Sequence, residues 1–223
     1  MDLTSSRIDS SDFQAAQETY HLNGWTDGLP IIPPSPDLVA ACLEWALLPP
    51  DHLVGVEPVR ERAITAEKLA VNSVMAGCLP EHFPLVVTAF TAMLQPDFLL
   101  HGATASTGGC AVLLIINGPI RHQLEMTGTF NAMGNTDRAS AVVGRAVRLA
   151  LINLLDVRPG DIDRSTLGHP GKFSYCLVED EENSPWSSLA EERLGESGVS
   201  AVTAVAAMAP RPVSYTHLTL PTK

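Results

Sequence analysis

The chain has 223 residues, of which 45% are hydrophobic and 17% charged, with 14 basic residues against 25 acidic ones. This composition is typical of a globular domain with a sizeable core, and the net charge of −11 argues against nucleic acid or an anionic membrane surface as a partner. Residues 1–12 are polar, unlike a signal peptide, and no apolar run reaches the length of a membrane span. We therefore expect a cytoplasmic protein whose partners are small molecules or other proteins, including a second copy of itself.

Four cysteines lie far apart in the chain, at Cys42, Cys78, Cys110 and Cys176. Without a secretory signal, reduced thiols are expected rather than disulfides. No CxxC or CxxH pair occurs, which argues against a structural zinc site. The sequence identifies no cofactor.

The N-terminal third is predicted to be mainly helical. Residues 12–23 predict a short helix, and residues 36–48 a second one that Ser35 caps. Apolar and polar residues alternate over residues 53–64, which predicts one strand near a sheet edge. A threonine cap and a following glycine delimit a third helix over residues 66–76.

In the middle of the chain, residues 80–95 predict a helix that starts with a proline. Residues 99–106 and 110–117 predict two strands, the second of which is a continuous apolar run of the kind buried on both faces. Residues 137–155 predict a long helix with its cap at Asn135 or Thr136.

Towards the C-terminus, residues 172–179 predict a strand, residues 186–194 a helix and residues 199–207 a last strand. Helices and strands without strict βαβ alternation predict an α/β or α+β fold, with helices packed on a mixed sheet. We divide the chain into four segments. They are an N-terminal helix and arm (1–23), a main domain (24–158), a smaller unit continuing that domain (159–212) and a tail (213–223).

The tail, VSYTHLTLPTK, matches a one-frame translation of sequencing-adapter DNA. We therefore expect residues 213–223 to be non-native and the natural sequence to be truncated near Pro212. On this expectation, residues of the tail belong to no functional site.

A first candidate site is the segment NSVMAGCLPEHFP, in which Cys78 falls between the end of one predicted helix and the start of the next. A helix N-terminus favours the thiolate, and Glu81 follows within one turn as a proton carrier. The structural alternative is that Cys78 is a small buried hydrophobic residue in a tight turn.

A second candidate is the loop that leads into the buried strand at 110–117. Backbone N–H groups of Gly108 and Gly109 are suited to an anion or a developing oxyanion, and Cys110 would supply a second thiol. Asn117 stands where this strand ends. A plain turn explains the glycines equally well.

A third candidate is the segment GHPGK, which places His169 and Lys172 on a turn rigidified by proline and glycine. His169 would transfer protons and Lys172 would bind an anionic group. Arg145 is a further anion-binding candidate, because it shares one face of the long helix with Arg138 and Arg148. Internal ion pairs would also explain these arginines.

Taken together, the motifs DGLPIIPPS, NSVMAGCLPEHFP, INGPI, GHPGK and EENSPW resemble a bacterial family of UGSC-type cysteine or selenocysteine proteins over residues 24–205. The resemblance implies thiol chemistry, with Cys78, Glu81, His169 and Lys172 in its matching motifs. The family's U/C-G-S-C tetrad is absent from the chain, which weakens that implication.

The sequence therefore predicts a thiol-dependent enzyme that acts on a small anionic molecule, by thiol redox chemistry or by cleavage of a C–S, C–N or acyl bond. One alternative is a non-catalytic subunit that docks on a redox or metal-bearing partner encoded nearby. Another is a metal-dependent hydrolase that uses His101, His169 and carboxylates.

Overall fold

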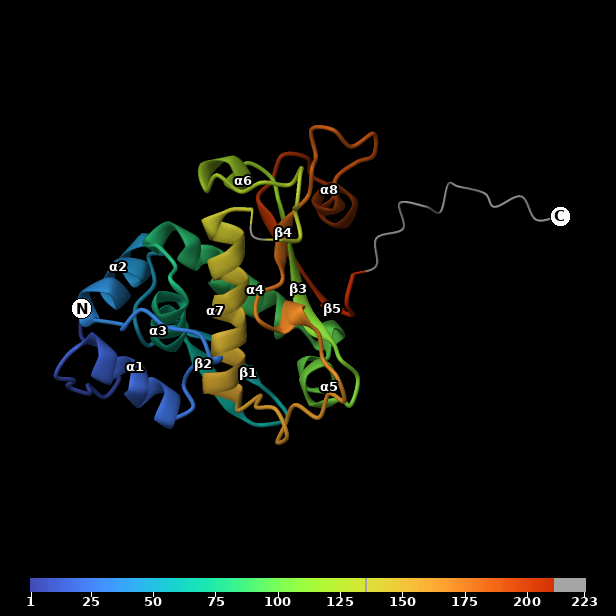
Figure 1. Cartoon of the computed structure of the whole chain (residues 1–223). Coiled ribbons are helices and arrows are strands. Elements are labelled where there is room, and N and C mark those ends of the chain that lie inside the picture. Colours follow the sequence, from blue (N-terminus) through green and yellow to red (C-terminus); the bar gives the residue numbers. More distant parts are fainter. Residues whose placement is uncertain (135, 211–223) are drawn as a thin grey trace.

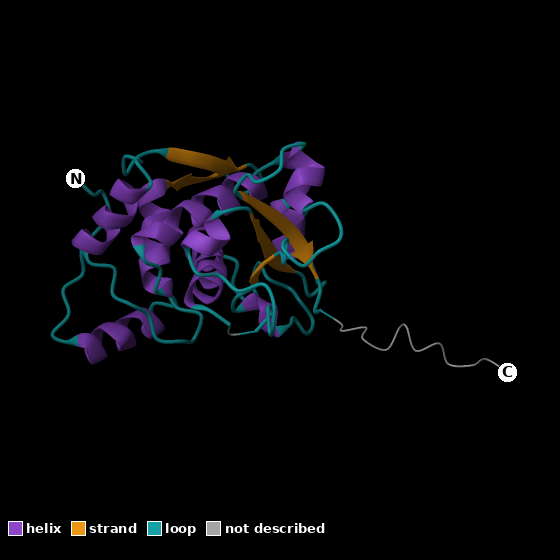
Figure 2. Cartoon of the chain, turned by 90° about the horizontal axis from the view of Figure 1, so that it is seen from above, coloured by secondary structure: helices purple, strands orange, loops and turns teal. Residues whose placement is uncertain are grey.

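The computed structural model describes residues 1–134 and 136–210, which form helices packed around two small sheets (Figures 1 and 2). The fold is therefore of the mixed α/β or α+β class. The predicted tail at 213–223 lies outside the described residues. The α-helices are α1 (Phe13–Leu22), α2 (Pro36–Trp45), α3 (Ala66–Ala76), α4 (Phe83–Met93), α5 (Leu100–Ala105), α6 (Ile120–Gln123), α7 (Arg138–Leu155) and α8 (Leu189–Leu194). The strands are β1 (Leu53–Glu57), β2 (Arg62–Thr65), β3 (Ala111–Asn117), β4 (Cys176–Val178) and β5 (Ala201–Ala207), and the 3₁₀ helices are η1 (Pro80–His82), η2 (Pro96–Phe98) and η3 (Pro170–Lys172).

Helix α7 runs through the centre of the molecule, between the helices α1 to α3 and the three-stranded sheet (Figure 1). It packs mainly against α3 and also contacts α4 and β4. Its apolar residues are buried on all these sides, so the helix depends on tertiary packing. Asp137 caps it by accepting a hydrogen bond from the Ser140 amide at 2.7 Å. The predicted cap Thr136 is thus wrong by one residue, and Asn135 lies outside the described residues.

The larger sheet has the strand order β4-β3-β5. The central strand β3 is parallel to β4 and antiparallel to β5, with Ala111 paired to Ala207 and Asn117 to Ala201. The predicted strands at 110–117 and 199–207 are confirmed. Because β4 and β5 belong to the predicted unit 159–212 while β3 belongs to 24–158, these two segments share one sheet.

Helix caps explain why the helices of the N-terminal half begin where the sequence indicated. Asp12, Ser35 and Thr65 each accept a hydrogen bond from a backbone amide three residues on, in α1, α2 and α3 respectively. Gly77 ends α3 at a φ of 98°, which is unstrained only for glycine.

Two predicted helices differ in extent: the one at 36–48 ends at Trp45, and the one at 80–95 is the 3₁₀ helix η1 followed by α4. Four other predicted elements differ further from the structure. Residues 53–64 form a hairpin of β1 and β2 rather than one strand, because the chain turns after Pro58 and Glu61 takes a φ of 54°. Residues 99–106 contain helix α5, in which Leu100 and Thr104, one turn apart, are the buried side chains. The strand predicted at 172–179 shortens to β4, since η3 occupies its start. The helix predicted at 186–194 begins at Leu189, after Ser188 as its cap.

No single helix of the described residues is long and apolar enough to cross a membrane. Two segments, 80–93 and 96–105, reach the required length and composition only together, and the pair is bent by 78°.

We predict that Gly144→Ala destabilises the fold. A Cβ atom at Gly144 would lie 2.7 Å from the backbone nitrogen of Tyr175 and 2.4 Å from Ser174 Oγ, so α7 and the segment before β4 would have to separate. We expect a loss of about 1–3 kcal/mol in the free energy of unfolding, measured by urea denaturation. Gly102→Ala, in helix α5 with nothing near its added methyl group, is the control and should not lower stability.

Candidate functional site

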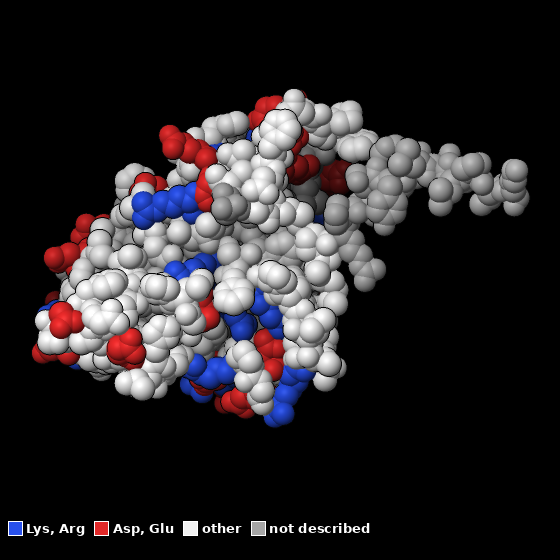
Figure 3. All heavy atoms as spheres, in the orientation of Figure 1, with Lys and Arg blue, Asp and Glu red and all other residues white. Residues whose placement is uncertain are grey.

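A cavity of about 940 Å³ lies between the turn at residues 24–27, the second half of α7 and the loop at residues 158–173. Its volume is in the range of small-molecule binding sites. Arg148 and Ile152 of α7 belong to its lining, and so does Lys172 of η3, which lies beside the same carboxylate, Asp163, as Arg148. In the view of Figure 3, basic and acidic side chains lie side by side in the lower half of the molecule, surrounded by uncharged residues. The cavity is therefore a place where charged groups and apolar surface meet.

Asp163 is the centre of the charged wall. Lys172 Nζ donates to its two carboxylate oxygens at 2.8 and 2.6 Å, and the Ser165 amide donates at 3.1 Å. The Asp163 side chain is only 4% exposed. Burial alone would raise its pKa, but the hydrogen bonds from Lys172 and Ser165 outweigh this effect and hold the pKa below its usual value. Asp163 is thus a buried carboxylate kept ionised by its partners.

Arg148 is the least satisfied charged group of the cavity. Its side chain is 13% exposed, and its closest carboxylate, Asp163, lies 3.6 Å from Nη2, which is longer than a hydrogen bond. Burial lowers the pKa of Arg148, while the charges of Asp163 and Asp27 act in the opposite direction. Within residues 1–134 and 136–210 no group accepts a hydrogen bond from this guanidinium. Its donors therefore remain available to an anion in the cavity.

His169 and Lys172 both line the cavity, as the sequence predicted for a shared site. His169 Nδ1 accepts a hydrogen bond from the Gly171 amide at 3.1 Å, and Nε2 lies 3.3 Å from the carbonyl oxygen of Ala207. This arrangement assigns the proton to Nε2, and the ring packs edge-to-face on Tyr175. As placed, His169 caps η3 and orients the loop.

The glycine loop before β3 lies against the cavity loop. Ser165 Oγ donates to the carbonyl of Gly108 at 2.9 Å and accepts from Lys172 Nζ at 2.6 Å. A Cβ at Gly109 would lie 3.3 Å from the Cα of Gly168, so the two backbones are in close contact. The predicted candidates at residues 108–110 and 168–172 therefore lie in contact, although Gly108 and Gly109 do not line the cavity.

Cys110 follows this glycine loop and is only partly buried, unlike the other three cysteines. It lines a small pocket of about 30 Å³, with room for a water molecule, that shares Arg148, Asp163 and Lys172 with the large cavity. Its Sγ lies 3.8 Å from Met208 Sδ. Cys110 is thus the thiol that lies beside the charged wall.

Cys78 occupies a different environment. Its side chain is 8% exposed, its Sγ lies 3.6 Å from the carbonyl of Val142, and burial raises the pKa of its thiol far above the ordinary value. Burial and the charge of Glu81 also raise the pKa of Cys42, to about 11. Neither Cys78 nor Glu81 lines the cavity that contains His169 and Lys172. The structure therefore does not bring together the predicted catalytic set of Cys78, Glu81 and His169.

The three arginines of α7 have different partners. Arg145 Nε and Nη2 bind the two carboxylate oxygens of Asp27 at 2.9 Å each, and Nη2 also donates to the Pro30 carbonyl at 2.8 Å. Arg138 donates to the carbonyl of Gly77 at 2.8 Å. These two arginines hold other segments against the helix. Arg148 remains the one that faces the cavity.

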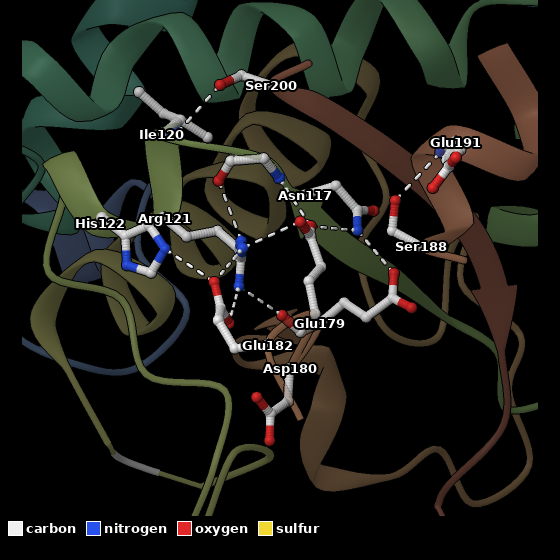
Figure 4. Close-up of polar contacts among 12 residues, drawn as sticks. Asn117, Ile120, Arg121, His122, Glu179, Asp180, Glu182, Ser188, Glu191 and Ser200 are labelled. Atoms are coloured by element: carbon white, nitrogen blue, oxygen red, sulfur yellow. Dashed lines mark hydrogen bonds and ion pairs between the residues drawn. The ribbon is translucent and has the colours of Figure 1, made fainter. Parts of the chain in front are cut away.

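Asn117, another predicted binding residue, belongs to a polar network away from the cavity (Figure 4). Its Nδ2 donates to Glu179 at 2.6 Å and to Glu181 at 2.8 Å. Arg121 lies beside them and donates to the Glu179 carbonyl and to the carboxylate of Glu182. The carboxylates of this network bind partners within the chain. Asn117 thereby connects the end of β3 to the segment that follows β4.

No group of three or more His, Cys, Asp or Glu side chains in the described part of the chain is arranged to hold a metal ion. His101, proposed in the metal-dependent alternative, lies on α5.

Four cavity residues carry no signal in the sequence: Asp163, Ser165, Leu167 and Phe173. They lie on a loop without periodicity, and their roles follow from contacts with α7 and the glycine loop. The signal that could have located the cavity was Arg148, a charged residue within an apolar helix that has to find a partner.

We predict that Asp163→Asn lowers the free energy of unfolding by about 3–5 kcal/mol at pH 7, because Lys172 and Arg148 lose their buried counter-charge. The folded-state pKa of Asp163 is lowered, so its stabilisation is complete above the unfolded pKa of about 3.9 and disappears as pH falls through the folded value. The difference between wild type and variant, measured by urea denaturation, should therefore shrink below about pH 4. Asp156→Asn, in an exposed pair with Arg62, is the control and should cost less than about 1 kcal/mol.

Compared with protein-family models, with curated proteins and with solved structures, the chain gives no match. The resemblance to UGSC-type proteins in its motifs thus stays an expectation from sequence. Function has to be argued from the chemistry of the cavity.

Proposed function

We propose that the chain binds a small anionic molecule in the 940 Å³ cavity and holds the anionic group on Arg148. The observation that carries this proposal is the guanidinium of Arg148, which lines the cavity and donates no hydrogen bond to any described residue. A guanidinium presents a planar pair of donors that matches a carboxylate or phosphate. Because Arg148 is largely removed from solvent, its electrostatic attraction to an anion is stronger than that of an exposed arginine.

The neighbouring charges support the same function. Lys172 is neutralised by Asp163, and Arg145 by Asp27, so these pairs give the cavity fixed dipoles without a net charge. Arg148 shares Asp163 with Lys172 and keeps an excess of positive charge. Whether the bound anion is converted depends on a reactive group next to it.

The proposal is tested by titrating the purified chain with acetate, benzoate and inorganic phosphate, using calorimetry or NMR shifts of the cavity residues. We expect saturable binding of at least one anion, and binding about tenfold weaker in Arg148→Lys, which keeps the charge but loses the paired donors. Arg62→Gln, in an exposed ion pair, is the control and should bind like wild type. Equal affinity in Arg148→Lys, or no binding of any anion, would remove the proposal.

A second candidate function is thiol chemistry at this site, with Cys110 in place of Cys78. Its support is the position of Cys110, partly accessible and in a pocket lined by Arg148 and Lys172. A thiol there can attack an electrophile bound in the adjoining cavity, whereas a fully buried thiol cannot reach one.

We expect iodoacetamide to label Cys110 first in the folded chain, forming an S–C bond with loss of iodide and release of the thiol proton. Cys42, Cys78 and Cys176 are buried and should react only after unfolding. Mass spectrometry of tryptic peptides after timed labelling measures the order. Labelling of Cys78 before Cys110 would favour the original prediction from sequence.

A further inference from the structure

Apolar residues share the cavity lining with the charged ones and form its apolar wall. Ile152, Leu167, Pro170 and Phe173 contribute to it. Leu167 is 95% exposed and Phe173 51% exposed, although both are large and apolar and lie on the same loop. Exposed apolar side chains gathered at a cavity are typical of a surface that a ligand covers.

The largely buried charges of the cavity leave an excess of one positive charge. Asp27 is neutralised by Arg145, and Asp163 by Lys172. Arg158 donates to the carbonyl of Gly24 and shares Asp156, 3.9 Å away, with Arg62; its side chain is 34% exposed, so solvent screens its charge. Among the described residues that line the cavity, Arg148 is then the largely buried cation with no carboxylate of its own. One negative charge complements it, whereas a dianion would bring a second charge into a partly desolvated site without a counter-charge.

The size of the cavity adds a further constraint. Acetate or phosphate would fill only a small part of about 940 Å³ and would leave the apolar wall uncovered. An extended apolar body attached to the anion would cover Leu167 and Phe173 and remove their surface from water.

We infer that the ligand is a monocarboxylate with an apolar aliphatic or aromatic body, an inference that rests on the proposed function. Its carboxylate lies at Arg148, and its body lies against Leu167, Phe173 and Ile152. Arg148 determines the charge of the accepted molecule, and Leu167 and Phe173 determine the length of its apolar part.

The test is a calorimetric titration of the full chain with acetate, butyrate, hexanoate and octanoate, with inorganic phosphate for comparison. Each methylene group that becomes buried should raise the affinity about fourfold. In the double variant Leu167→Ala with Phe173→Ala, this dependence on chain length should fall by about half or more, while the affinity for acetate stays the same. Because both side chains are exposed, the variant should fold like wild type.

Leu47→Ala removes an equally exposed leucine that does not line the cavity, and it should leave the whole series unchanged. An affinity that does not rise with chain length, or phosphate bound more tightly than octanoate, would overturn the inference while binding at Arg148 still holds. If no anion binds, or if binding is indifferent to Arg148→Lys, the proposed function itself fails.

Discussion

The ion pair between Asp163 and Lys172 is the contact on which the cavity depends. It closes the loop at residues 158–173 on itself, and Ser165, bonded to Lys172, connects that loop to the glycine segment before β3. Burying a carboxylate is costly unless hydrogen bonds and an opposite charge compensate, and Asp163 has both. Because Lys172 binds both oxygens of this carboxylate, Arg148 lies 3.6 Å from it and makes no hydrogen bond to it. The contact that stabilises the loop is thus also the one that leaves the donors of Arg148 for the proposed anion.

Helix α7 places three arginines against an apolar core and gives each a different role. Arg138 and Arg145 hold the Gly77 turn and the 27–30 segment against the helix. The contact of Arg145 with Asp27 positions one wall of the cavity, since Asp27 belongs to its lining. Arg148, further along the helix, is left with unused donors. A helix that packs against the core on most of its sides therefore also supplies the anion-binding group that we propose.

The thiols separate according to burial. A helix-to-helix junction in the sequence favours a reactive Cys78, but the thiol packs under α7 and burial outweighs any effect of the helix that follows. Cys110, which the sequence marked only as a second thiol, is the one next to charged groups and solvent. A nucleophile in this chain would have to work from that position if it acts on a molecule in the cavity.

Local chemistry was enough to predict the capped helices and the buried strands. Asp12, Ser35, Thr65 and Gly77 mark helix ends through contacts within a few residues, and β3 is apolar enough to be identified alone. The short segment at 99–106 was misassigned, because one turn of helix and a short strand carry the same apolar pattern. The sequence alone also identified His169, Lys172 and the arginine face as chemically notable. Only the tertiary structure decided which of these groups meet, since ion pairs such as Arg145 with Asp27 join residues more than a hundred positions apart, and burial depends on everything packed around a side chain.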